Sequence, residues 1–146
     1  MSWQDLVNGN TELADSGASR LCDRVAYLAT VDKYRNPRIH PISAQLQDNR
    51  LFALMYPTSP KAHDLQRSSH YALHCGVEDN SGGGDEFYVR GVADQTENPD
   101  DWELIRSGKQ DECGSKYILF ELRVQQAFSM QYTVHDTAFD RSRQSD

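Results

Sequence analysis

Residues 38–65 read RIHPISAQLQDNRLFALMYPTSPKAHDL, and this stretch decides the predicted fold. It predicts two strands joined by a tight turn at Asp48-Asn49, with the second strand running directly into a helix. Pro60 suits the first position of that helix, because its fixed φ is already helical and it has no backbone N–H to leave unpaired. Ser59 then falls at the N-cap, where its hydroxyl can accept a hydrogen bond from the first turn.

The start of this helix has the chemistry of a phosphate site. Lys61 adds an ammonium group to the free N–H groups and the partial positive charge of the helix N-terminus. Arg38 opens the first strand, and pairing of residues 38–47 with residues 50–56 outward from the turn would bring it towards Lys61. Most Ser-Pro helix starts bind nothing, so the convergence of two cations is what favours a phosphate here.

The rest of the chain predicts a mainly β protein of the α+β type, and a single domain over residues 1–146. Helices are expected over residues 3–22, with a break at 8–10 and a new cap at Thr11, and over residues 60–67 and 99–108. The tail beyond His135 is polar, and we expect it to be loosely ordered. Six strands are expected, over residues 24–31, 38–47, 51–56, 71–77, 86–95 and 117–132. Short strands joined mostly by turns predict an antiparallel barrel with peripheral helices.

Pro41 lies inside the second of these strands. Proline cannot donate to a strand ladder, so this strand must lie at an edge, carry a bulge or be split open at Pro41. A ligand could use the place where pairing lapses, because a neighbouring peptide group can then face outward. A plain edge-strand proline explains the residue equally well.

The ordered motifs resemble the pyridoxamine 5′-phosphate oxidase-like, FMN-binding split β-barrel family. The resemblance covers about residues 20–95 and rests on LATV at 28–31, PRIHPIS at 37–43, SPKAHDL at 59–65, YALH at 71–74 and FYVRG at 87–91. It implies a six-stranded antiparallel split β-barrel and a homodimer that binds FMN at the subunit interface. Residues matching Arg38, Ser59 and Lys61 would hold the phosphate, and backbone on the two preceding strands would contact the ring. The cofactor-binding residues expected on this basis are Arg38, Ile39, His40, Pro41, Ile42, Met55, Tyr56, Pro57, Ser59, Pro60 and Lys61.

The resemblance further implies a flavin-dependent oxidoreductase acting on a small organic substrate. The flavin does the chemistry in such enzymes, so no catalytic acid–base pair is required of the chain. The sequence departs from the true oxidases in lacking their C-terminal Arg-x-His signature, since neither residues 134–136 nor residues 141–143 match it. Pro60 also stands where those enzymes carry a basic residue. Oxidation of a B6 vitamer is therefore not implied.

Two alternatives remain open on the same fold. One is a reductase that uses the deazaflavin F420, although its polyglutamyl tail calls for a basic groove that this acidic chain does not offer. The other is a flavin or haem carrier, or a redox sensor, that binds its cofactor without turnover.

Composition excludes several classes of function. The net charge of −7 disfavours nucleic acid, whose phosphates demand a basic surface. No apolar run is long enough to span a membrane, and the start, MSWQDLVNGN, is not a signal peptide, so a cytoplasmic location is expected. Three cysteines, Cys22, Cys75 and Cys113, fit reduced structural thiols.

The histidines do not predict a metal site. His74 falls in the predicted strand 71–77 and His70 directly precedes it, and in an extended chain this spacing separates the two by about 13 Å, too far for one ion. The remaining three are expected on the surface or in a pocket wall, namely His40, His63 and His135. There is no Gly-x-Ser-x-Gly nucleophile motif, and Cys75 within an apolar strand is typical of a core residue.

Overall fold

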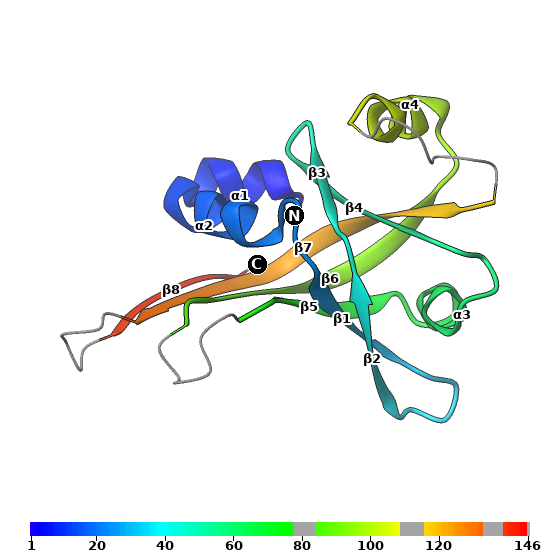
Figure 1. The fold of residues 1–146 in the computed structure, drawn as a ribbon, viewed down its shortest axis with the longest axis horizontal. Helices are drawn as coiled ribbons and strands as arrows, with labels where there is room; N and C mark the ends of the chain where they lie inside the picture. Colours follow the sequence, from blue (N-terminus) through cyan, green and yellow to red (C-terminus); the bar gives the residue numbers. More distant parts are fainter. Residues whose placement is uncertain (78–83, 109–115, 133–138, 146) are drawn as a thin grey trace.

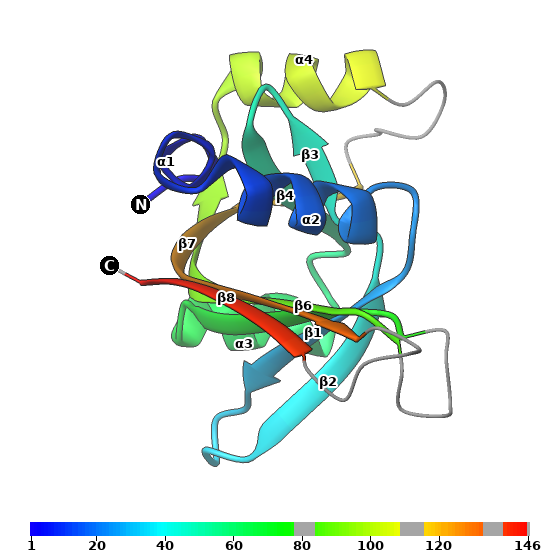
Figure 2. The ribbon, with the colours of Figure 1, turned by 90° about the vertical axis from the view of Figure 1, so that its left-hand side faces the viewer.

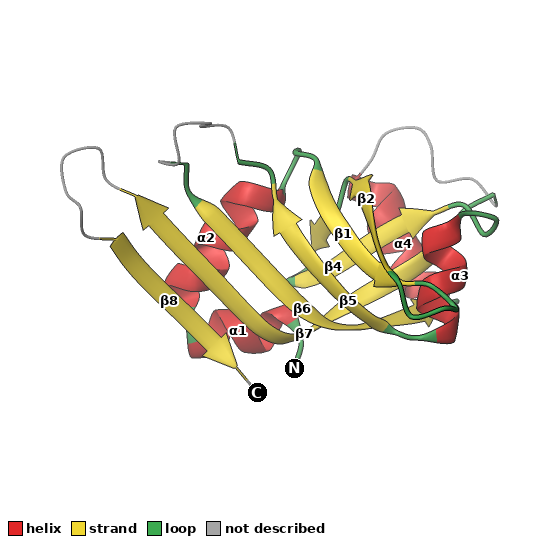
Figure 3. Ribbon diagram, turned by 90° about the horizontal axis from the view of Figure 1, so that it is seen from below, coloured by secondary structure: helices red, strands yellow, loops and turns green. Residues whose placement is uncertain are grey.

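The computed structural model describes residues 1–77, 84–108, 116–132 and 139–145. Their strands form one antiparallel sheet. Its strands run in the order β2-β1-β5-β6-β7-β4-β3, with β8 paired to β7. Figure 3 shows the sheet strongly curved. The strands are β1 (Ala26–Val31), β2 (Pro37–Ile42), β3 (Gln45–Gln47), β4 (Arg50–Met55), β5 (His70–Cys75), β6 (Glu86–Thr96), β7 (Ile118–Tyr132) and β8 (Phe139–Ser145). The predicted mainly β split barrel is confirmed, but the predicted count of six strands is wrong, because the described residues contain eight.

Four helices surround the sheet in the described residues: α1 (Trp3–Gly9), α2 (Thr11–Leu21), α3 (Pro60–Arg67) and α4 (Pro99–Gly108). The predicted break near residue 9 is confirmed, but the cap of α2 is Asn10 rather than Thr11, because the Asn10 side chain accepts from Leu13 N–H. Figures 1 and 2 show α1 and α2 on the concave side of the sheet. None of these helices is long and apolar enough to span a membrane.

The main core lies between the concave face of the sheet and the first two helices. Every second side chain along each strand points into this core, as in β5, where Tyr71, Leu73 and Cys75 are buried. Trp3 packs its ring against Phe87 of β6 at 5.9 Å between centroids. A smaller cluster under α4 contains Phe52, Ile105 and Leu119, with Leu54, Trp102 and Leu104 packed against it.

The segment from Pro37 to Gln47 is two strands, so the prediction of one strand paired with residues 50–56 is wrong. Of these two strands, β3 alone pairs with β4, from Gln45 opposite Phe52 to Gln47 opposite Arg50. The turn at Asp48-Asn49 is confirmed, since both residues have positive φ as a two-residue hairpin requires. By contrast, β2 pairs along its whole length with β1.

A local turn explains why β2 takes β1 as its partner. The Asp32 carboxylate accepts from the N–H groups of Tyr34 and Asn36, both at 2.9 Å, and Arg35 adopts a φ of 70°. This hairpin commits β2 to one margin of the sheet, while β3 lies at the other. The chain crosses between the margins at Ser43-Ala44, and β2 has no second strand partner among the described strands.

The C-terminal strand was not predicted. Residues 139–145 form β8 along the outer half of β7, whereas the sequence suggested a loosely ordered tail. Residues 133–138, which include His135, lie outside the described residues. The segment FDRSRQS has no apolar alternation, the sequence signal that predicts a strand.

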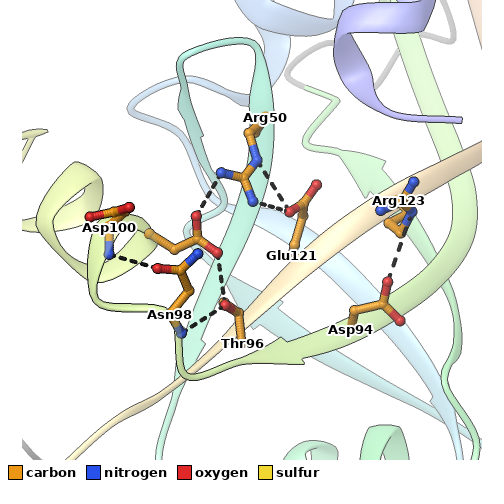
Figure 4. A network of polar contacts seen from close by, with 8 residues as sticks. Arg50, Asp94, Thr96, Asn98, Asp100, Glu121 and Arg123 are labelled. Carbon is orange, nitrogen blue, oxygen red and sulfur yellow. Dashed lines mark hydrogen bonds and ion pairs between the residues drawn. The ribbon is translucent and has the colours of Figure 1, made fainter.

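A charged network ties β4, β7 and α4 together (Figure 4). Arg50 reaches Asp101 at 2.6 Å and also pairs with Glu121, while the Thr96 hydroxyl donates to Asp101 at 2.7 Å. Hydrogen bonding from Arg50 lowers the pKa of Asp101, so the carboxylate stays charged at neutral pH. The network supports the fold and contains none of the residues expected to bind a cofactor.

Candidate functional site

The inner face of β2 carries two of the expected site residues. Alternation turns Arg38 and His40 inward, where both are half-buried, and turns Ile39 and Pro41 outward into solvent. Ile42 completes the inner row and is buried in the main core. Of the three alternatives that Pro41 left open, an edge strand, a bulge or a split, the structure shows the edge strand, because β2 is the marginal strand.

Helix α3 faces this row and begins as predicted at Pro60. Ser59 is its N-cap, with the hydroxyl accepting from Ala62 N–H at 3.4 Å and donating to the Tyr56 carbonyl at 2.7 Å. Lys61 is half-buried in the first turn, and Leu65 anchors the helix in the core. The helix thus presents its N-terminus and a lysine beside β2.

A buried carboxylate joins the helix to the strands. Asp64 of α3 is fully buried, and its Oδ2 accepts a hydrogen bond from the Thr30 hydroxyl of β1 at 2.7 Å. The same oxygen lies 3.0 Å from Arg38 Nε. That contact is an ion pair without hydrogen-bond alignment, because Arg38 Nε is buried with no hydrogen-bond partner in the described structure. The other carboxylate oxygen, Asp64 Oδ1, is also buried with no hydrogen-bond partner there. Asp64 therefore holds Arg38 against α3, although 38% of the arginine side chain remains exposed.

His40 lies within this group of charges. Its Nε2 is 3.2 Å from the Thr30 hydroxyl oxygen. Burial lowers the pKa of His40, and the charges of Lys61 and Arg38 lower it further, against the opposing effect of Asp64. Both cations therefore act on one imidazole. Arg38 lies on the inner face of β2 with His40, and Lys61 lies three residues before Asp64 on α3, which packs on β1. The predicted hairpin is not what relates these two elements, because β2 pairs with β1.

The other expected residues occupy different surroundings. Met55 is buried in the core, so only its backbone could meet a ligand. Tyr56 is 50% exposed and stacks on Tyr117 at 4.8 Å between ring centroids. Pro57 and Pro60 are exposed beside the start of α3.

Three residues of this region were missed from sequence: Thr30, Asp64 and Tyr117. Asp64 left a signal only in its chemistry, because a carboxylate on the buried face of a helix requires a partner. Thr30 and Tyr117 left none, since their roles depend on which strands and strand ends become neighbours in the folded sheet.

Two surface hollows are lined by neither Arg38 nor Lys61. One, of about 490 Å³, is lined by residues between α2, β3 and α4, including Cys22, Gln45 and Gly108. Burial raises the pKa of the Cys22 thiol, which does not favour a reactive thiolate. The other, also of about 490 Å³, lies on the outer face of the sheet and includes His70 and Arg90.

His70 and His74 both lie on β5, which begins at His70, one residue before the predicted start of this strand. The described residues contain no cluster that could hold a metal ion. Cys75 is a buried free thiol, as expected, and Cys22 is free and exposed. Cys113 lies outside the described residues.

Several solved structures share this architecture, whereas no family model and no curated protein matches the chain. A haem-binding protein from Mycobacterium smegmatis has a TM-score of 0.67 at 15% identity over 90% of this chain, which spans only 56% of that protein. Rv2991 from Mycobacterium tuberculosis, a conserved hypothetical protein, has a TM-score of 0.68 at 19% identity over 82% of each chain. A pyridoxamine 5′-phosphate oxidase candidate from Listeria innocua has a TM-score of 0.64 at 20% identity, over 80% of this chain and 96% of the other.

At such identities the likeness establishes the arrangement of strands and helices alone. In this chain, that arrangement comprises the curled antiparallel sheet, the separation of β2 from β3 and the short helix after β4. The chain has the split β-barrel fold of the pyridoxamine 5′-phosphate oxidase-like proteins.

Proposed function

We propose that this protein binds FMN and works as a flavin-dependent oxidoreductase on a small organic substrate. The observation that carries the proposal is that Arg38, on the inner face of β2, is paired with Asp64 of α3, the helix whose first turn carries Lys61. Two cations and a helix N-terminus are suited to a phosphate group. The similarity to an oxidase candidate on the same fold supports this assignment.

The residues present fit a phosphate-bearing flavin. Arg38 is held by Asp64 through Nε and is still partly exposed, and Lys61 lies one residue into the helix. Ser59 would strengthen the site only if its hydroxyl turned from the Tyr56 carbonyl. When bound, a flavin supplies hydride and electron transfer, while the chain holds and orients it. The stacked Tyr56–Tyr117 pair offers an aromatic surface close to the same helix.

We further propose that the protein is a homodimer with the flavin site at the subunit interface. The outer face of β1 and β2 supports this, because apolar residues stand opposite one another across the two strands. Ile39 is 69% exposed, and Tyr27 and Val31 are exposed on the neighbouring strand. An apolar surface of this kind is typical of a protein contact.

The direct test is a flavin titration of Lys61→Ala. Loss of one charge-assisted contact should weaken FMN binding by roughly 1.5–3 kcal/mol, measured by quenching of flavin fluorescence. Arg106→Ala is the matched control, since Arg106 is an exposed cation on α4 that pairs with Glu103 at 3.5 Å. Equal affinity in wild type and Lys61→Ala would contradict the site, and a wild type that binds no FMN would contradict the function.

Haem binding is a second candidate. The exposed His70 lines the outer hollow together with Tyr88 and Arg90. His70 could serve as an iron ligand, Tyr88 as an aromatic wall and Arg90 as the partner of a haem propionate. A structural neighbour described as a haem-binding protein points the same way. The absorption spectrum of freshly purified protein separates the candidates, because haem, flavin and the deazaflavin F420 absorb differently. Mixing with NADH or NADPH without oxygen then tests whether a bound flavin is reduced.

A further inference from the structure

A chain of hydrogen bonds fixes the neutral form of His40. The Thr30 hydroxyl has one proton, and it donates that proton to the Asp64 carboxylate, which can only accept. The Thr30 oxygen must therefore accept from its other neighbour, His40 Nε2. The neutral imidazole then carries its proton on Nε2, and Nδ1 is left with a lone pair. Nδ1 is the atom that can take up a second proton.

The charges around His40 are unbalanced in a way that bears on the ligand. Arg38 and Lys61 are positive, Asp64 is negative and neutral His40 adds nothing, so the group carries one net positive charge. The outlying Asp32, 3.9 Å from Arg38, and Arg67, 3.6 Å from Asp64, offset each other. A phosphate monoester at neutral pH is a dianion, which this group matches only if it gains one more positive charge.

We propose that His40 becomes protonated when the dianionic phosphate of a monoester binds between Arg38 and Lys61, and so acts as a third, proton-linked phosphate contact. The inference rests on the proposed FMN function and deepens it, because it specifies a dianionic phosphate monoester as the group recognised.

The direction of the linkage follows from the surroundings. Without ligand, burial and the two cations keep the pKa of His40 below its usual value, so the imidazole is neutral at neutral pH. An anion beside it favours the charged form and raises that pKa. The groups that face His40 are Thr30 from β1, Arg38 from β2, and Lys61 and Asp64 from α3. Binding thus takes up a proton, and the contribution of His40 is complete at low pH and lost as the pH rises through the ligand-bound pKa.

The experiment compares FMN affinity of wild type and His40→Gln at about pH 5.5 and about pH 8. The phosphate itself titrates near pH 6, so the ratio of the two dissociation constants is the quantity to follow. We expect the advantage of wild type to shrink about tenfold from the lower to the higher pH, which corresponds to a shift of one pKa unit on binding. Calorimetry in two buffers should show that wild type takes up more protons than His40→Gln.

His63→Gln is the matched control, because His63 is an exposed histidine on α3. It should retain the pH dependence of wild type. Riboflavin lacks the phosphate, so its affinity should show no pH dependence that requires His40. Parallel profiles of wild type and His40→Gln would overturn the inference and leave the proposed function intact. A folded wild type that binds FMN at neither pH would overturn both.

Discussion

Asp64 is the single residue on which the geometry of the candidate site most depends. It holds Thr30, Arg38 and α3 together from a fully buried position. Asp64→Ala removes the acceptor of a buried hydroxyl and the partner of a half-buried guanidinium. We expect a loss of about 2–3 kcal/mol in the free energy of unfolding, measured by urea denaturation.

Asp64→Asn is the informative comparison for that prediction. The amide oxygen still accepts from Thr30 but no longer pairs with the charge of Arg38, so we expect a smaller loss than in Asp64→Ala. If both variants unfold at the urea concentration of wild type, Asp64 does not hold the site together.

At the same scale, sequence reasoning identified the two cations of the candidate site but not the residues that support them. Arg38, Ser59 and Lys61 are recognisable because each belongs to a local pattern, a strand start or a helix cap. Asp64 and Thr30 come together only after α3 packs on β1, and no local pattern encodes that contact.

Among the elements, the junction of β6 and β7 is the least tolerant of change. The register shifts between Arg90 and Gly91, and a Cβ on Gly91 would lie 1.8 Å from the Arg123 carbonyl oxygen. Backbone cannot move aside as a flexible side chain can, so Gly91→Ala should lower the free energy of unfolding by about 3 kcal/mol or more.

Gly76→Ala is the matched control for that substitution. Its Cβ would meet the Val25 carbonyl oxygen at 3.4 Å, an ordinary contact, so its stability should stay close to that of wild type. Urea denaturation of both variants provides the measurement. Equal stability of the two would show that the strands are not in close contact at the bulge.

The elements predicted best are those with their own local signals. Helix α3 begins at Pro60 and α4 at Pro99, as their caps indicated. The two errors, the division into β2 and β3 and the missing β8, concern partner choice between strands. Partner choice depends on competition among distant segments, whereas a cap depends on a few adjacent residues.

For the molecule as a whole, the proposed homodimer can be tested on the outer face of β2. Ile39→Glu places a charge on an exposed apolar residue whose main-chain pairing is unaffected. We expect the variant to sediment as a monomer and to lose FMN affinity at least tenfold, because desolvating an unpaired charge opposes association.

Ser19→Glu is the control for that experiment, since it adds the same charge at an exposed position on α2. It should sediment as wild type does. A wild type that is monomeric at all concentrations would contradict the homodimer, and a dimeric Ile39→Glu that still binds FMN would place the contact elsewhere.

The fold of the whole molecule was predictable further than its activity. Ordered motifs over the first two thirds of the chain sufficed to indicate a split barrel, and the sheet confirms it. The sequence does not identify a substrate or an electron donor, because the proposed flavin chemistry requires no distinctive catalytic group from the chain and the same scaffold accommodates many reactions.

The marginal position of β2 also bears on whether the sheet can extend into a fibril. The unpaired N–H and C=O groups of an exposed edge strand can form backbone hydrogen bonds with a strand of another molecule. Pro37 and Pro41 both lie in this strand and lack the amide hydrogen that such growth requires. Two prolines within six residues therefore make this border a poor template for polymerisation.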